Sequence, residues 1–121
     1  MPTLLTQDIG DTDLSYLLYE GDGPTMMLMH ATGFPPGMWH PIARELAPRW
    51  RVIAPYFCAH RDADPEQGGV SWFTIAADFA RFCTLLGLDS PAFVGHSMGA
   101  TVSTIAHATF GIEARGLILI E

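Results

Sequence analysis

Short runs of apolar residues alternate with longer amphipathic segments along most of the chain. Each run has the length of a strand and is far too short to cross a membrane. The predicted strands are residues 13–20, 25–30, 50–55, 90–96 and 115–121. The predicted helices are residues 38–47, 72–86 and 98–110. Because strands that alternate with helices indicate parallel βαβ units, the pattern predicts an α/β fold, with a mostly parallel sheet and helices on both faces.

The helix predicted at residues 72–86 has recognisable ends. Ser71 is a suitable N-cap, and Gly87 suits the first position after the helix. Apolar residues at helical spacing define one face, which we expect to lie in the core. These residues are Trp72, Ile75, Ala76, Phe79, Phe82 and Leu86. The Asp, Pro and Gly residues of the preceding segment, 56–69, predict a loop.

Composition narrows the class of protein. The chain has 121 residues, which fits one domain, and 49% of them are hydrophobic, which suffices for a core. A formal net charge of −7 without a basic patch argues against nucleic acid and anionic membranes as partners. The N-terminal residues show no secretory signal. Cys58 and Cys83 suggest free thiols in a reducing compartment, so we expect a cytoplasmic location.

The chemistry centres on the pentapeptide Gly95-His96-Ser97-Met98-Gly99, which has the form G-x-S-x-G. It follows a predicted strand and precedes a predicted helix, which is the context that the motif requires. Glycines on both sides remove Cβ clashes in a tight turn, which lifts the Ser97 hydroxyl above the end of the sheet. The N–H of Met98 then lies at a helix N-terminus, directed at developing negative charge. The alternative is a glycine-rich turn with an incidental serine.

Two further segments accompany this motif. They are MLMHATGFPPGMW, from Met27 to Trp39, and WRVIAPYFCAHR, from Trp50 to Arg61. With the serine motif, they resemble the N-terminal half of an α/β-hydrolase. The resemblance implies that residues 1–121 form the first portion of one such domain, incomplete at its C-terminus, with the cap and last strands outside this chain. It also implies that the N–H of Thr32 is the second oxyanion donor, and that His30 holds the oxyanion loop by hydrogen bonds.

The family's triad runs Ser, then Asp or Glu, then His, so a base is expected after the last strand. No histidine follows His107, which lies ten residues past Ser97 on the same predicted helix. That spacing corresponds to roughly 15 Å of helical rise, too far for a proton transfer. His96 adjoins the serine and is rejected as the base. We therefore expect the catalytic histidine to lie outside this chain. By resemblance, Glu121 is a candidate triad acid, or simply a carboxylate at a strand end.

The remaining candidates are weaker. His40 and His60 are most simply surface or loop residues, and Cys58 with His60 offers too few ligands for a metal site. We expect neither a metal nor another cofactor. Phe34, Trp39 and Tyr56 lie near the expected cleft edge, where they would favour a substrate with an apolar acyl or leaving group. The same side chains could equally be core or rim residues.

The sequence thus predicts a serine hydrolase that acts on an ester or related acyl bond. Without its base, the chain alone should be weakly active or inactive. A lyase or C–C hydrolase on the same fold is one alternative, because a fold does not fix chemistry. A non-catalytic binding or interaction module is another. In that case, the sheet edge would pair with a complementing C-terminal chain or with a second copy.

Overall fold

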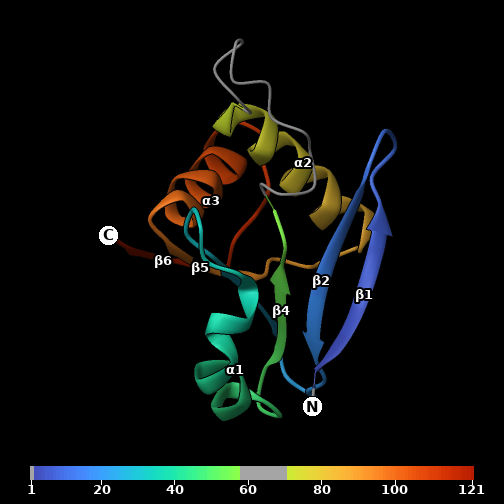
Figure 1. The fold of residues 1–121 in the computed structure, drawn as a ribbon, viewed down its shortest axis with the longest axis vertical. Helices are drawn as coiled ribbons and strands as arrows, with labels where there is room; N and C mark the ends of the chain where they lie inside the picture. The colour runs from blue at the N-terminus through green and yellow to red at the C-terminus, as the bar shows by residue number, and fades with distance from the viewer. Residues whose placement is uncertain (1, 58–70) are drawn as a thin grey trace.

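A computed structural model describes residues 2–57 and 71–121, in which the strands form one sheet (Figure 1). The strands are β1 (Thr3–Asp8), β2 (Asp13–Tyr19), β3 (Thr25–Met29), β4 (Arg51–Pro55), β5 (Ala92–His96) and β6 (Gly116–Ile120). Their order across the sheet is β1-β2-β4-β3-β5-β6. β1 and β2 run antiparallel to their neighbours, whereas β4, β3, β5 and β6 are parallel to one another. The sheet is therefore mostly parallel, as the alternating pattern predicts.

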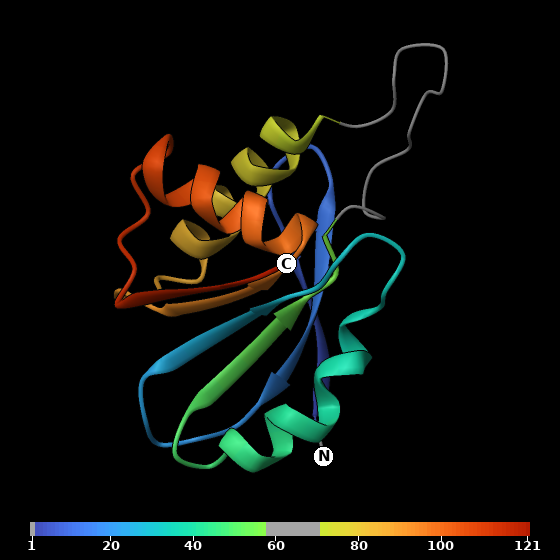
Figure 2. The same ribbon diagram turned by 90° about the vertical axis from the view of Figure 1, so that its left-hand side faces the viewer.

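Helices cover both faces of the sheet. A 3₁₀ turn, η1 (Pro36–Trp39), leads into α1 (His40–Leu46) on one face, and α2 (Trp72–Leu85) and α3 (Met98–Ala108) lie on the other (Figure 2). The chain passes from β3 to β4 on one side, then crosses back over β3 to reach β5. The connections after β3 and β5 consequently diverge, which creates a crevice at the carboxyl ends of these two strands.

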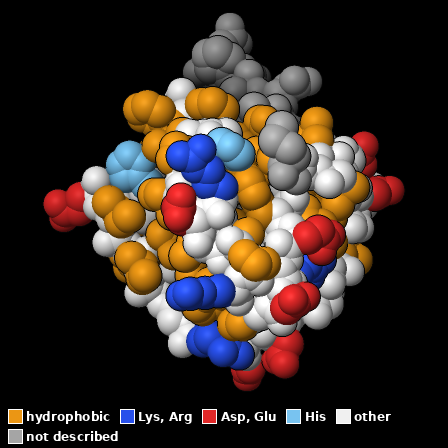
Figure 3. All heavy atoms as spheres, turned by 90° about the horizontal axis from the view of Figure 1, so that it is seen from below, with side chains coloured by type: hydrophobic (Ala, Val, Ile, Leu, Met, Phe, Trp, Pro, Cys, Tyr) orange, Lys and Arg blue, Asp and Glu red, His pale blue; other side chains and the backbone are white. Residues whose placement is uncertain are grey.

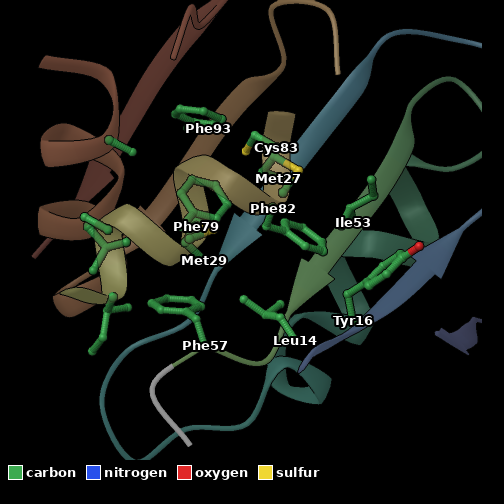
Figure 4. Close-up of a cluster of buried hydrophobic side chains, with 14 of the residues drawn as sticks. Leu14, Tyr16, Met27, Met29, Ile53, Phe57, Phe79, Phe82, Cys83 and Phe93 are labelled. Atoms are coloured by element: carbon green, nitrogen blue, oxygen red, sulfur yellow. The ribbon is translucent and has the colours of Figure 1, made fainter. Parts of the chain in front are cut away.

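The apolar run in β3 is explained by the helices that cover both faces of the sheet. Met27 and Met29 belong to the cluster beneath α2 and α3, whereas Met26 and Leu28 belong to the cluster beneath α1. The larger cluster is shown in Figure 4, where aromatic rings fill the space between α2 and the sheet. Phe79 is central to it: its ring centroid lies 5.4 Å from that of Phe93 and 6.4 Å from that of Phe82.

The predicted ends of α2 are confirmed. The Ser71 hydroxyl accepts a hydrogen bond from the N–H of Phe73 at 3.2 Å, which caps the first turn. Gly87 follows the C-cap with a φ of +65°, the left-handed conformation that glycine adopts most readily. The helix is therefore fixed at both ends by local interactions that the sequence specifies.

Two expectations need correction. β1 was not predicted, because its residues are nearly all exposed and hydrogen bonds to β2, rather than burial, hold it in the sheet. The helix expected at 38–47 begins as the 3₁₀ turn η1, and α1 starts only at His40, because Pro41 lacks the N–H that would continue an α-helix from the preceding turn.

We expect Phe79→Ala to lower the free energy of unfolding by about 3–5 kcal/mol, because it leaves a cavity among packed aromatic rings. Phe73→Ala removes an aromatic ring from the same helix, but Phe73 is 59% exposed. This control should change stability by less than about 0.5 kcal/mol. Urea denaturation of the two variants tests the assignment, and equal losses would contradict it.

Candidate active site

Ser97 lies between β5 and α3 in a backbone conformation that is rare outside glycine. Its φ is 54° and its ψ is −110°, and its side chain is exposed. Its N–H donates to the carbonyl of Ile120 at 2.8 Å, and its carbonyl accepts from the N–H groups of Ala100 and Thr101. The strained residue is therefore held from both sides, by β6 and by the first turn of α3. This arrangement presents the hydroxyl at the carboxyl end of the sheet.

The glycines that flank the serine allow this turn because no side chain would fit. A Cβ on Gly95 would lie 2.6 Å from the backbone nitrogen of Ala100. A Cβ on Gly99 would collide with the backbone at the end of β3, 2.6 Å from the carbonyl carbon of Met29. The contact at Gly99 also sets how closely α3 approaches β3. Both glycines of the motif thus have a steric role in the structure.

The loop after β3 meets the serine turn directly. The Thr32 hydroxyl donates to the sulfur of Met98 at 3.3 Å, although 66 residues separate the two in sequence. The N–H of Phe34 closes a turn onto the carbonyl of Ala31 at 3.1 Å. Among the described residues, no backbone carbonyl accepts from the N–H of Thr32 or of Met98. The loop after β3 and the serine turn are therefore in contact, while the role of the Thr32 and Met98 N–H groups as oxyanion donors stays a prediction.

His30 lies at the base of this loop and is 6% exposed. Its Nδ1 is 2.8 Å from the carbonyl of Ala31, so this nitrogen carries the proton and donates it. The ring also lies against Phe57, with centroids 4.3 Å apart. Burial lowers the pKa of His30, outweighing the hydrogen bonds with the backbone of Ala31 and Phe57, which raise it. A neutral His30 therefore contacts both the loop after β3 and the segment after β4.

Two hollows flank this region. The first, of about 330 Å³, lies beside the loop after β3, and its wall is almost entirely apolar. It is lined by His30, Gly33, Phe34, Pro35, Pro36, Tyr56 and Phe57. The second, of about 340 Å³, contains the serine itself. It is lined by Trp72, Ser97, Ala100, Thr101, Leu119, Ile120 and Glu121. A molecule with its reacting group at Ser97 could thus contact either hollow.

The structure brings together most of the residues that the sequence singled out, but not all. Phe34 and Tyr56 line the first hollow, and Ser97 and Glu121 share the second. Trp39 is a correction: it is only 5% exposed and packs in the cluster beneath α1, because η1 turns it toward the sheet instead of the cleft.

Trp72 is the second correction, and a site residue that the sequence analysis missed. It was assigned to the core face of its helix, yet it is 44% exposed and lines the hollow that contains Ser97. Its position at the first residue after the cap could have signalled this, because a first-turn side chain can extend past the core. Pro35, Pro36 and Phe57 also line a hollow without having been singled out.

None of the described histidines is positioned to act as the base for Ser97. The ring of His96 faces Phe34, with centroids 6.3 Å apart. His107 contacts the carbonyl of Ile112 at 2.8 Å, and His40 contacts the hydroxyl of Tyr19 at 2.8 Å. No hydrogen bond joins the Ser97 hydroxyl to a histidine within residues 2–57 and 71–121. Cys58 and His60 lie outside the described residues.

Other chemistry receives little support from the described part of the chain. Cys83 is a buried free thiol, and burial raises its pKa to about 12, which makes it a poor nucleophile. No three His, Cys, Asp or Glu side chains gather there as metal ligands would. None of the helices in residues 2–57 and 71–121 has the length and hydrophobicity that a membrane crossing needs. Figure 3 shows one face of the molecule, on which acidic and basic side chains are interspersed with hydrophobic ones.

Comparison with known proteins places this geometry in context. A family model described as the alpha/beta hydrolase fold matches residues 24–121. A 2-(acetamidomethylene)succinate hydrolase of Mesorhizobium japonicum is 28% identical over 114 residues, which are 94% of this chain and 41% of that enzyme. An uncharacterised protein of Mycobacterium tuberculosis is 30% identical over 83 residues, which are 69% of this chain and 24% of that protein. The chain thus spans well under half the length of these curated relatives.

Solved structures agree on the fold. An epoxide hydrolase from Vigna radiata superposes with a TM-score of 0.86 over 99% of this chain and 40% of its own. Its sequence is only 16% identical, so the likeness concerns the fold and not the reaction. The sheet order and the helix arrangement described above are therefore those of a known fold family.

We expect Gly99→Ala to destabilise the fold by roughly 1–3 kcal/mol or more, because the added methyl group would press on the backbone at the end of β3. Gly37→Ala is the control, since a Cβ there would meet nothing within 4 Å. Thermal unfolding of both variants measures the difference. If Gly99→Ala proved as stable as Gly37→Ala, the close approach of α3 to β3 would be wrong.

We expect acid to destabilise the protein through His30. The unfolded histidine titrates near its ordinary pKa of 6.5, whereas the folded one titrates lower. Between these two pKa values, the unfolded state binds more protons, so the free energy of unfolding falls as pH drops below about 6.5. Above that pH the effect vanishes.

His30→Asn is the matched variant, because its amide can still donate to Ala31 but does not titrate. Urea denaturation of both proteins between pH 5 and 8 should show the extra loss in the unmodified protein alone. Parallel pH profiles would mean that His30 is not buried in its neutral form.

Proposed function

The chain belongs to the α/β-hydrolase fold family, and we propose that it carries the nucleophile of a serine hydrolase acting on an ester or related acyl bond. One observation supports this above the others. Ser97 is a non-glycine residue with a φ of 54°, it is exposed, and its turn contacts the loop after β3 through Thr32 and Met98. Strain of this kind concentrates at functional sites, where the surrounding structure maintains it.

In the proposed reaction, the Ser97 oxygen attacks the substrate carbonyl carbon while its proton passes to a base. The carbonyl electrons move onto the oxygen, and the N–H groups of Thr32 and Met98 stabilise the resulting oxyanion. The intermediate then collapses: the bond to the leaving group breaks, the leaving group takes the proton, and an acyl-Ser97 ester remains. Water attacks that ester by the same route, releasing the acid and restoring the serine.

The proposed reaction also needs a base and an acid beside Ser97. We propose that the histidine belongs to a part of the protein outside residues 1–121, since no described histidine contacts Ser97. Glu121 is the candidate for the acid, because it lines the same hollow as the serine and could orient such a histidine. On this basis, residues 1–121 alone should hydrolyse activated esters weakly or not at all.

The substrate class follows from the first hollow. Its volume of about 330 Å³ and its wall of Phe34, Pro36 and Phe57 suit an apolar acyl or leaving group of modest size. A lyase or a C–C hydrolase would need the same serine turn and remains a second enzyme class to test. A binding module would need the hollows alone and would leave the serine inert.

With imidazole added as an external base, we expect a fluorophosphonate probe to label the protein at Ser97 and Ser97→Ala to abolish labelling. Ser90→Ala is the matched control, because Ser90 is the other described non-glycine residue with positive φ, at 42°, and lies before β5 instead of after it. Intact mass and peptide mapping locate the label. Imidazole alone also hydrolyses a p-nitrophenyl ester, so it is the rate above this background that should rise with the unmodified protein and not with Ser97→Ala.

The outcomes separate the classes. Labelling at Ser97 without any esterase activity, even with imidazole, would point to another reaction on the same nucleophile. Saturable binding of an apolar ligand together with a Ser97 that stays unlabelled even with imidazole would support the binding module and contradict the hydrolase.

A further inference from the structure

A hydrogen bond between two side chains joins the two residues that are proposed to stabilise the oxyanion. The Thr32 hydroxyl donates to the Met98 sulfur, and the oxygen and the sulfur are 3.3 Å apart. The backbone N–H of each of these residues is one of the two proposed donors. We propose that the Thr32 hydroxyl and the Met98 thioether are positioning groups, which hold the two N–H groups at the separation that an oxyanion needs. This inference rests on the function proposed for Ser97.

The Met98 end of this bond is rigid. Met98 is the first residue of α3, directly after Ser97, and it is only 1% exposed. Its side chain packs in the apolar cluster beneath α2 and α3. Close packing restrains the thioether, so it gives the loop after β3 a well-defined acceptor. Because a thioether is a weak acceptor, the bond orients Thr32 more than it stabilises the fold.

The peptide group that carries the Thr32 N–H is also held at its other end. Its carbonyl belongs to Ala31, and it accepts from the N–H of Phe34 at 3.1 Å and from Nδ1 of His30 at 2.8 Å. In a trans peptide, the carbonyl and the N–H lie in one plane and point in opposite directions. Two bonds to the Ala31 oxygen therefore also restrain the direction of the Thr32 N–H. The bond to Met98 then fixes this peptide group relative to the serine turn.

Other contacts between the loop and the serine turn are less directional. The rings of Phe34 and His96 are 6.3 Å apart and inclined at 44°, so they can slide past each other. The close approach at Gly99 sets how near α3 lies to β3, but it does not orient Thr32. Loss of the bond between Thr32 and Met98 should therefore leave the fold intact and let the loop shift slightly. Oxyanion donors act only when they point at the developing charge, so the shift should slow the attack by Ser97.

Labelling kinetics of the 121-residue chain with an alkyl fluorophosphonate, in the presence of imidazole, test this role. The Ser97 oxygen bonds to phosphorus, the P–F bond breaks, fluoride leaves, imidazole takes the serine proton, and the phosphoryl oxygen occupies the oxyanion position. Thr32→Val and Met98→Leu each remove one partner of the bond. Each should lower the maximal labelling rate by roughly fivefold to tenfold, because the donors are then less well aimed. The probe concentration that gives half the maximal rate should change little.

The double variant tests whether the two side chains act through one bond. It should label no more slowly than either single variant, because the first substitution already removes the bond. Thr32→Ser should keep most of the rate, since it retains the hydroxyl. Thr84→Val is the matched control, because it removes a threonine hydroxyl that donates to the carbonyl of Ala80 at 3.1 Å on α2. It should label at the rate of the unmodified chain.

Each way in which the proposal can fail gives its own result. If the unmodified chain is never labelled at Ser97, the proposed function fails and the positioning role fails with it. If the unmodified chain is labelled and both single variants match its rate, only the positioning role is wrong. A slow Thr32→Val beside a fast Met98→Leu would mean that the hydroxyl contacts the probe itself. Losses that only follow the fraction of folded protein, measured by thermal unfolding, would also overturn the proposal.

Discussion

The candidate site depends on how closely the start of α3 approaches the end of β3. Gly99 lies against the backbone of Met29 and His30, where no side chain would fit. This contact brings the helix N-terminus beside the loop that follows β3. It is also what lets the Thr32 hydroxyl reach the Met98 sulfur and what holds Ser97 in its strained conformation. A methyl group at one position would therefore disturb both halves of the site.

The sheet supports that contact from both faces. Alternate residues of β3 enter two separate apolar clusters, so the strand is anchored beneath α1 as well as beneath α2 and α3. The loop after β3 is held in turn by His30, a buried neutral imidazole that bonds to Ala31 and packs on Phe57. Strain at Ser97 persists because rigid neighbours on every side leave the backbone no easier conformation.

Local signals account for what could be predicted. The helix of residues 72–85 was recognisable from a serine cap, a terminal glycine and apolar spacing, all of which act over a few residues. The turn at Ser97 was recognisable because its two glycines remove local clashes. β1 was not predicted because backbone hydrogen bonds to β2 hold it in the sheet. Such bonds produce no pattern of buried apolar residues in the sequence of an exposed strand. Trp39 was expected at the cleft and is buried, whereas Trp72 was expected in the core and is exposed. Contacts between elements far apart in sequence decide both outcomes, and local patterns do not record them.

The sequence by itself determined the alternation of strands and helices from β2 onward and the strained serine turn, because both rest on patterns local to the chain, and its motifs resembled those of the family to which the chain belongs. Only the tertiary structure decided which aromatic residues line the hollows. Trp39 is buried by η1 and Trp72 is exposed beside Ser97, and both outcomes follow from how elements far apart in sequence pack together.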